Sequence, residues 1–262
     1  MSIFFEESGN SEGQTIVFLH GGGISGWMWQ KQLEHFGDYH CIVPDLPEHG
    51  RSMDEGPLSI KDCSLRIARL IEERANGGKA VVVGHSLGAK VAVELLSARP
   101  DLVRCAVVAS GLFRSMRLLK ATHKPFIYKM TVWMIKSKSI LSLLVKSFKF
   151  TDSYSRDHLI KDFQMLTAES LYRVYDQLYQ NLDLPEGLDR VEVPTLVIAG
   201  DREIKAMKQS VADIAGALPF AAGAYMLKGD HTYPWSMYEC FNEIIRMWIE
   251  CGEIKHESVR KI

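Results

Sequence analysis

The sequence predicts an α/β fold built on a mostly parallel β-sheet. Two observations support this prediction: short, nearly continuous apolar runs recur along the chain, and most are followed by a stretch in which apolar residues have helical spacing. Continuous apolar runs are typical of strands in a parallel sheet, because helices bury both faces of such a sheet. Strand–helix alternation over 262 residues therefore indicates one α/β domain with room for an insertion.

The predicted strands and helices follow one another in a regular order. We expect buried strands near residues 15–20, 40–46, 79–85, 104–110 and 195–200, and edge strands near 3–8 and 224–229, which makes about seven strands. We expect helices near 25–36, 59–76, 87–99, 205–218 and 235–251. The helix at 59–76 has the clearest pattern, and the pair Gly77 and Gly78 is a typical helix end.

Residues 112–182 interrupt the alternation. They contain several helical patterns and no strand pattern, which separates a core of residues 1–111 and 183–262 from an all-helical insertion. Between residues 112 and 151 there are nine Lys and Arg residues and no acid. We interpret the apolar residues here as pocket lining and inter-helix core, and the lysines as a solvated face. Two alternatives are steering of an acidic substrate and transient contact with anionic membrane lipid.

Composition and charge exclude several classes of protein. The chain is 47% hydrophobic and 24% charged with a formal net charge of −1, which is typical of a globular protein and gives no indication of nucleic-acid binding. The five cysteines show no CxxC pair, so we expect reduced thiols rather than a disulfide framework or a metal site. The sequence shows neither a signal-peptide pattern nor a transmembrane run, and we expect a cytoplasmic protein without a cofactor.

Ser86 is the candidate nucleophile. The stretch "VVVGHSLGAKVAVELL" (81–96) is an apolar strand pattern, then G-H-S-L-G, then a helix pattern. Gly84 and Gly88 allow the strand and helix to approach closely around a sharp turn that exposes the serine hydroxyl. The turn also places Ser86 at a helix N-terminus, where free amides favour developing negative charge. A GxSxG pattern alone gives moderate support for a nucleophilic serine. Its position between a strand pattern and a helix pattern makes that support considerably stronger.

A glycine-rich stretch supplies a candidate oxyanion hole. "TIVFLHGGG" (15–23) ends a strand pattern in His-Gly-Gly-Gly, where the backbone can come close to a substrate. The amide of Gly22 could then bind an oxyanion together with the amide of Leu87, and the alternative is a flexible turn before a helix. We interpret His20 as a hydrogen-bonded structural residue.

His231 is the candidate base among nine histidines. It follows the last strand candidate and precedes a helix that begins near Pro234, which places it in a loop at the carboxyl edge of the sheet. His85 lies inside the turn and is expected to point away from the serine. His49 is expected to be structural or at the rim of the site.

The base needs a carboxylate, and the candidates are Asp201 and Glu203. An imidazole acting on a serine needs an acid to hold its tautomer and stabilise the imidazolium. No Asp or Glu occurs between Asp101 and Asp152, so the loop after strand 104–110 supplies none. Asp201 follows Gly200 and could bond its own local backbone, whereas Glu203 could interact with the dipole of the next helix. The residues alone do not decide whether Asp201 or Glu203 is the partner of the histidine.

The chain resembles the α/β-hydrolase family. "LHGGG", "PDLPEHGRS", "GHSLG", "VPTLVIAGDRE" and "GDH" occur in the order and approximate spacing of that family's motifs. The resemblance implies an acid three residues beyond the glycine, which favours Glu203, and a helical cap formed by residues 112–182. Two departures stand out: Glu48 replaces a common Gly, and the first strand hairpin is shortened.

These residues predict a hydrolase. We expect Ser86 to form an acyl-enzyme with a small carboxylic ester or related acyl compound. One alternative is a C–C bond hydrolase that uses the same three residues. Another is a ligand-binding member of the fold without activity, because a fold does not determine a function.

Overall fold

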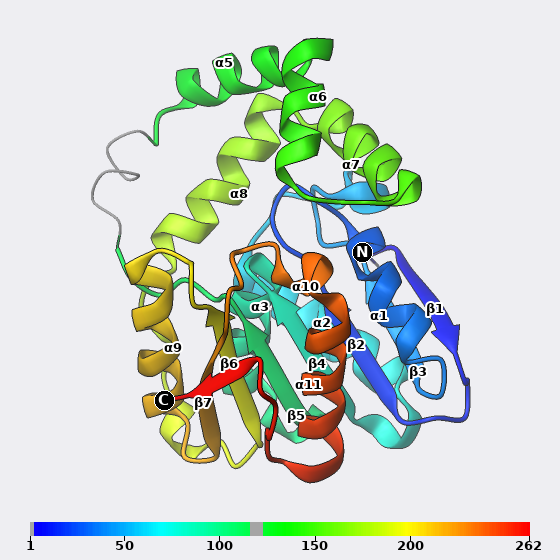
Figure 1. Ribbon diagram of the computed structural model, residues 1–262, viewed down its shortest axis with the longest axis vertical. Coiled ribbons are helices and arrows are strands. Elements are labelled where there is room, and N and C mark those ends of the chain that lie inside the picture. The colour runs from blue at the N-terminus through cyan, green and yellow to red at the C-terminus, as the bar shows by residue number, and fades with distance from the viewer. Residues whose placement is uncertain (1–2, 116–122) are drawn as a thin grey trace.

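The computed structural model describes residues 3–115 and 123–262 and contains an eight-stranded sheet in the order β1-β3-β2-β4-β5-β6-β7-β8 (Figure 1). The strands β2 to β7 are parallel, and β1 and β8 run antiparallel at the two edges. The strands are β1 Phe5–Gly9, β2 Thr15–Leu19, β3 His40–Pro44, β4 Ala80–His85, β5 Val103–Ala109, β6 Thr195–Gly200, β7 Ala221–Met226 and β8 Val259–Lys261. The predicted α/β fold is confirmed.

One strand was not predicted. The expected edge strand at 224–229 is instead β7, which begins at Ala221 and lies inside the sheet, because β8 pairs with Ala224–Met226. The sequence count of about seven strands is therefore one too low. β8 is three residues long and largely exposed, so its own sequence carries no apolar pattern. Pairing with β7 makes it a strand.

Helices cover both faces of the sheet (Figure 1). Residues of α2, α3 and α9 form one core cluster with the sheet, and residues of η1, α10 and α11 belong to a second cluster. The α-helices of the core are α1 Gln30–His35, α2 Ile60–Arg74, α3 Leu87–Ala98, α9 Lys205–Ala217, α10 Tyr233–Ser236 and α11 Tyr238–Cys251. The short 3-10 helices are η1 Gly26–Trp29, η2 Gly50–Ser52, η3 Asn76–Gly78, η4 Pro100–Leu102 and η5 Leu188–Arg190.

The helix α2 shows how local sequence determines where a helix begins, which side it buries and where it ends. Ser59 caps its N-terminus by accepting a hydrogen bond from the Asp62 amide at 3.3 Å. Its apolar stripe, which includes Ile67 and Ile71, is fully buried against the sheet. The chain then turns through Gly77 and Gly78, both with positive φ, as expected for glycines that end a helix.

Among the described residues, four α-helices lie between β5 and β6 in the chain and stand over the carboxyl edge of the sheet (Figure 1). They are α5 Pro125–Ile135, α6 Lys138–Ser147, α7 Ser153–Met165 and α8 Ala168–Gln180. We call residues 123–182 the helical segment. Within its described residues there is no strand, in agreement with the sequence pattern. The division of the chain at residues 112 and 182 stays a prediction.

A buried carboxylate joins the helical segment to the core. Asp162 on α7 accepts hydrogen bonds from Ser25 Oγ at 2.9 Å and from Trp27 Nε1 at 2.6 Å. Burial raises the pKa of Asp162 to about 6, although these two donors act in the opposite direction. The folded protein therefore binds a proton at this site more tightly than the unfolded chain does.

Asp162 is expected to make folding stability depend on pH. Because its folded pKa is raised, stability is lost as pH rises through about 6 and regained on acidification. From pH 7 to pH 5 the free energy of unfolding should increase by about 1.3 kcal/mol through this group alone. Asp162→Asn keeps an acceptor oxygen but does not titrate, so the variant should lack this increase in the free energy of unfolding. Denaturant unfolding of both proteins at the two pH values measures it, and identical pH dependence in the variant would contradict the assignment.

Candidate active site

The sharp turn between β4 and α3 exposes Ser86. Ser86 has φ 56° and ψ −107°, an unfavourable backbone conformation for a residue with a side chain. Its amide donates to the carbonyl oxygen of Ala109 on β5 at 2.9 Å, which holds the turn against the sheet. A Cβ atom at Gly84 would collide with the backbone of Gly88, and one at Gly88 would collide with Leu19. Both glycines are therefore needed for the close approach of strand and helix.

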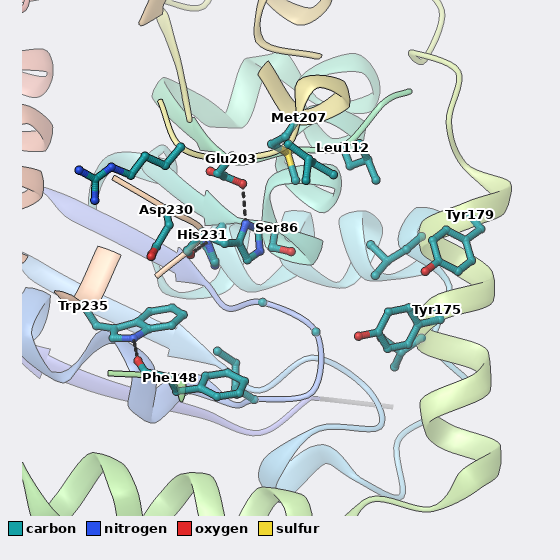
Figure 2. Close-up of a pocket in the computed structure, with 18 residues that line it drawn as sticks. Ser86, Leu112, Phe148, Tyr175, Tyr179, Glu203, Met207, Asp230, His231 and Trp235 are labelled. Carbon is teal, nitrogen blue, oxygen red and sulfur yellow. Dashed lines mark hydrogen bonds and ion pairs between the residues drawn. The ribbon is translucent and has the colours of Figure 1, made fainter. Parts of the chain in front are cut away.

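His231 and Glu203 are hydrogen-bonded beside Ser86. Nδ1 of His231 lies 2.8 Å from Oε2 of Glu203, and Figure 2 shows the imidazole between Glu203 and Ser86. The buried Glu203 carboxylate is also held through Oε1, which accepts from Ser110 Oγ at 2.6 Å and from the Gly200 amide at 2.9 Å. An imidazole whose Nδ1 faces a carboxylate has Nε2 free for the serine.

Ser86 and His231 are adjacent but unbonded. Within residues 3–115 and 123–262, no hydrogen bond joins the Ser86 hydroxyl to the imidazole of His231. In enzymes without substrate, hydrogen bonds of the reacting groups are commonly long and shorten in the substrate complex. The arrangement of serine, histidine and glutamate thus has the order that proton transfer from Ser86 requires.

Asp201, the second candidate acid, lies apart from His231. Its amide donates to Met226 on β7 at 2.9 Å, and its carbonyl accepts from Lys208 at 3.1 Å. Its Oδ1 atom is buried without a hydrogen-bond partner in the described part of the chain. The structure therefore brings Glu203 and not Asp201 to the imidazole. Asp201 lies in a turn, as the sequence indicates, but its carboxylate accepts no backbone hydrogen bond among the described residues.

The two amides predicted to bind an oxyanion flank the serine. Gly22 lines the same pocket as Ser86, and Leu87 is the first residue of α3. Neither amide donates to another protein group among the residues that the structure describes. Unused amides at a helix start and in a glycine turn suit a negatively charged oxygen. Their joint action on a substrate stays a prediction.

His20 and His49 have structural roles. The fully buried His20 accepts from the Leu46 amide at 2.9 Å and contacts the Gly21 carbonyl, and burial lowers its pKa to about 4. His49 accepts from the Gly23 amide at 3.0 Å, which fixes the glycine-rich turn. The prediction that His20 is a hydrogen-bonded structural residue is confirmed.

His85 is a site residue that the sequence reasoning missed. We expected it to point away from Ser86, but it lines the same pocket and its ring centroid lies 4.7 Å from that of His231. Its Nε2 atom is 3.1 Å from the His231 carbonyl. Burial, together with the neighbouring His231, holds the pKa of His85 well below its usual value, so the ring is neutral. His85 therefore supports the loop that carries His231.

The pocket above Ser86 has a volume of about 530 Å³ and is mostly apolar. Figure 2 shows Tyr175 and Tyr179 of α8 on one side and Trp235 and Phe148 on another. The indole of Trp235 donates to the Phe148 carbonyl at 2.6 Å. Residues of the helical segment thus form pocket walls that the core alone leaves open. The sequence did not show which individual residues of this segment line the pocket.

Two ion pairs connect the helical segment to the core at this edge. Asp230, next to His231, pairs with Lys149; burial acts to raise the pKa of Asp230, but hydrogen bonds from Lys149 and Thr232 lower it to about 2. Glu48 has a positive φ of 64° and accepts from Arg173 Nε of α8 at 2.6 Å. The Glu48 carboxylate is therefore paired and buried, and its backbone keeps a conformation that suits the glycine it replaces.

Comparison with known proteins agrees with this architecture. A sequence profile described as the Alpha/beta hydrolase family matches residues 16–240. The chain belongs to the α/β-hydrolase family. In the described ranges of this α/β hydrolase, no group of three or more His, Cys, Asp or Glu side chains is arranged to hold a metal ion.

Individual relatives are distant or matched in part. An AB hydrolase superfamily protein of Gibberella zeae is 37% identical over 48% of this chain, and that match covers 46% of the relative, so the similarity spans about half of its length. The (E)-2-((N-methylformamido)methylene)succinate hydrolase of Acinetobacter baylyi is 23% identical over 94% of this chain and 93% of its own. The structure of a thermophilic esterase from Thermogutta terrifontis superposes with a TM-score of 0.69 at 19% identity, over 96% of this chain and 94% of that one.

The two candidate acids can be separated by substitution. Glu203→Gln removes the charge next to His231, so hydrolysis that uses this imidazole as its base should slow by about 10³–10⁴-fold. Asp201→Asn changes a carboxylate that does not contact the imidazole and should alter turnover by less than about threefold. Steady-state kinetics on a p-nitrophenyl ester measures both. The reverse ranking of the two variants would show that Asp201 is the acid.

Proposed function

We propose that this α/β hydrolase is a serine hydrolase that cleaves a small carboxylic ester through an acyl-enzyme on Ser86. The observation that carries the proposal is the hydrogen bond between the buried Glu203 carboxylate and His231, beside a serine in a strained turn. This juxtaposition brings together residues from the ends of β4, β6 and β7, which are far apart in sequence. A nucleophile, a base and an orienting acid in this order are the requirements of acyl transfer.

The reaction follows from these positions. The Ser86 oxygen attacks the ester carbonyl while His231 accepts the hydroxyl proton, and Glu203 stabilises the resulting imidazolium. The amides of Gly22 and Leu87 hold the negative oxygen of the tetrahedral intermediate, a contribution of about 3–4 kcal/mol per donor in comparable sites. His231 then protonates the departing alcohol, and water, activated by the same imidazole, releases the acid from Ser86.

The pocket walls favour an apolar acyl or alcohol group. The cavity of about 530 Å³ accepts a group of short to medium length, and aromatic side chains such as Tyr175 and Trp235 offer apolar surface along it. Burial of each methylene contributes about 0.8 kcal/mol to binding. The ratio kcat/KM should therefore rise with chain length from acetate to hexanoate esters. A C–C bond hydrolase uses the same three residues, so ring-cleavage diketones belong in the same substrate panel.

Ser86→Ala tests the proposal directly. The variant should lose ester turnover by more than about 10⁴-fold and lose labelling by a fluorophosphonate probe, because no acyl-enzyme can form. Ser97→Ala, at the far end of α3, is the matched control and should keep both activity and labelling. Thermal melts of both variants report the integrity of the fold. A probe that labels wild type and Ser86→Ala equally would overturn the assignment.

A further inference from the structure

The outer face of α5 is apolar and exposed. Phe126, Met130, Trp133 and Met134 recur at spacings of four, three and one residues, which places them on one side of the helix. Their side chains are exposed by 60%, 50%, 76% and 40%. Leu143 of the neighbouring helix α6 is 70% exposed. We call these five residues the apolar face.

The apolar face is separate from the interior of the helical segment. The opposite side of α5 carries Tyr128, Val132 and Ile135, which are buried, and α5 packs against α6 and α8. Figure 1 places α5 and α6 at the end of the molecule farthest from the sheet. The expectation that the apolar residues here serve only as pocket and inter-helix core is therefore wrong for the apolar face. Exposed aromatic residues gathered on one helix indicate an interaction surface.

Five exposed lysines lie on or next to the two helices that carry the apolar face. Lys124, Lys129 and Lys136 on or next to α5, with Lys138 and Lys146 on α6, are all exposed. None of the five forms an ion pair within the described parts of the chain. No acid occurs between residues 112 and 151, so nothing along this stretch neutralises them. The two helices that carry the apolar face thus have lysine as their only charged residue type, and Glu169 of α8 lines a small surface pocket together with Lys129.

We propose that the apolar face docks on an anionic lipid bilayer. Tryptophan, phenylalanine and methionine side chains suit the boundary between headgroups and acyl chains, and lysines reach anionic headgroups from the same helix. The contact is interfacial, since no helix among the described residues is long and apolar enough to cross a bilayer. A second copy of the chain fits less well, because a two-fold contact would bring together helices whose only charged residues are lysines.

Vesicle co-sedimentation of the full chain tests the proposal. Vesicles of phosphatidylcholine with 30% phosphatidylglycerol should bind at least tenfold more protein than pure phosphatidylcholine vesicles. Raising sodium chloride from 0.05 M to 0.5 M should remove most of this difference, because salt screens the lysines. Equal binding to both vesicle types, or sedimentation with neither, would overturn the proposal.

Matched variants locate the contact. Trp133→Ala should weaken binding to the anionic vesicles about tenfold, whereas Phe220→Ala, which truncates an exposed aromatic ring of the core, should leave binding unchanged. The double variant Lys129→Gln with Lys136→Gln should lose about fivefold per charge, and Lys61→Gln with Lys79→Gln serves as its control. Thermal melts verify that each variant folds. Equal losses in variants and controls would show that the contact lies elsewhere.

Fluorescence and molar mass distinguish the lipid from other occupants. Brominated acyl chains should quench Trp133, the most exposed of the five tryptophans, and Trp133→Phe should keep binding but lose this quenching. Light scattering over a range of concentrations reports self-association. A dimer that Trp133→Ala converts to a monomer, without quenching by brominated lipid, would assign the apolar face to a second copy and overturn the proposal.

Discussion

The backbone turn between Gly84 and Gly88 is the constraint on which the rest of the site depends. The turn requires two glycines because strand β4, helix α3 and the end of β2 meet with no space for a side chain. It also holds Ser86 at a positive φ, which costs on the order of 1–3 kcal/mol and persists only because the surrounding sheet and helix enforce it. The geometry of that turn places Ser86 in the wall of the pocket, at the start of α3.

The acid of the site is positioned by three strand ends together. Glu203 comes from the loop after β6, the imidazole that it orients follows β7, and Ser110 follows β5. No acid follows β5, yet the Ser110 hydroxyl donates to Glu203 and fixes the carboxylate oxygen that does not face the histidine. A buried carboxylate whose two oxygens are both bonded cannot rotate freely, so the orientation of His231 is set before substrate arrives. Ring contact with His85 adds a second restraint on the same loop.

The helical segment has two faces with different chemistry. Its inner side contributes Phe148 and two tyrosines of α8, Tyr175 and Tyr179, to the pocket, and ion pairs of Lys149 and Arg173 hold it to the core. Its outer side presents the apolar face and its lysines to the surroundings. Because α5 packs directly on α8, the proposed lipid contact and the pocket wall lie on adjoining helices. A substrate with an apolar tail would meet chemically similar surfaces outside and inside the protein.

The sequence by itself determined the sheet, most of its strands, the turn at Ser86 and the position of His231. These features depend on local patterns: continuous apolar runs, helical spacing and glycines at fixed offsets. It narrowed the candidates for the carboxylate beside His231 to Asp201 and Glu203 by elimination and, through the resemblance, favoured Glu203, which contacts the imidazole.

Tertiary structure decided the features that local sequence patterns do not contain. Only packing shows that Glu203 reaches His231 while Asp201 does not, that His85 turns toward the site, and that β8 exists through pairing alone. Likewise, an apolar residue in an amphipathic helix is equally compatible with a core and with a surface. Trp133 is exposed because, among the described residues, no helix lies over that side of α5, and this depends on how the helices pack together rather than on the sequence of one.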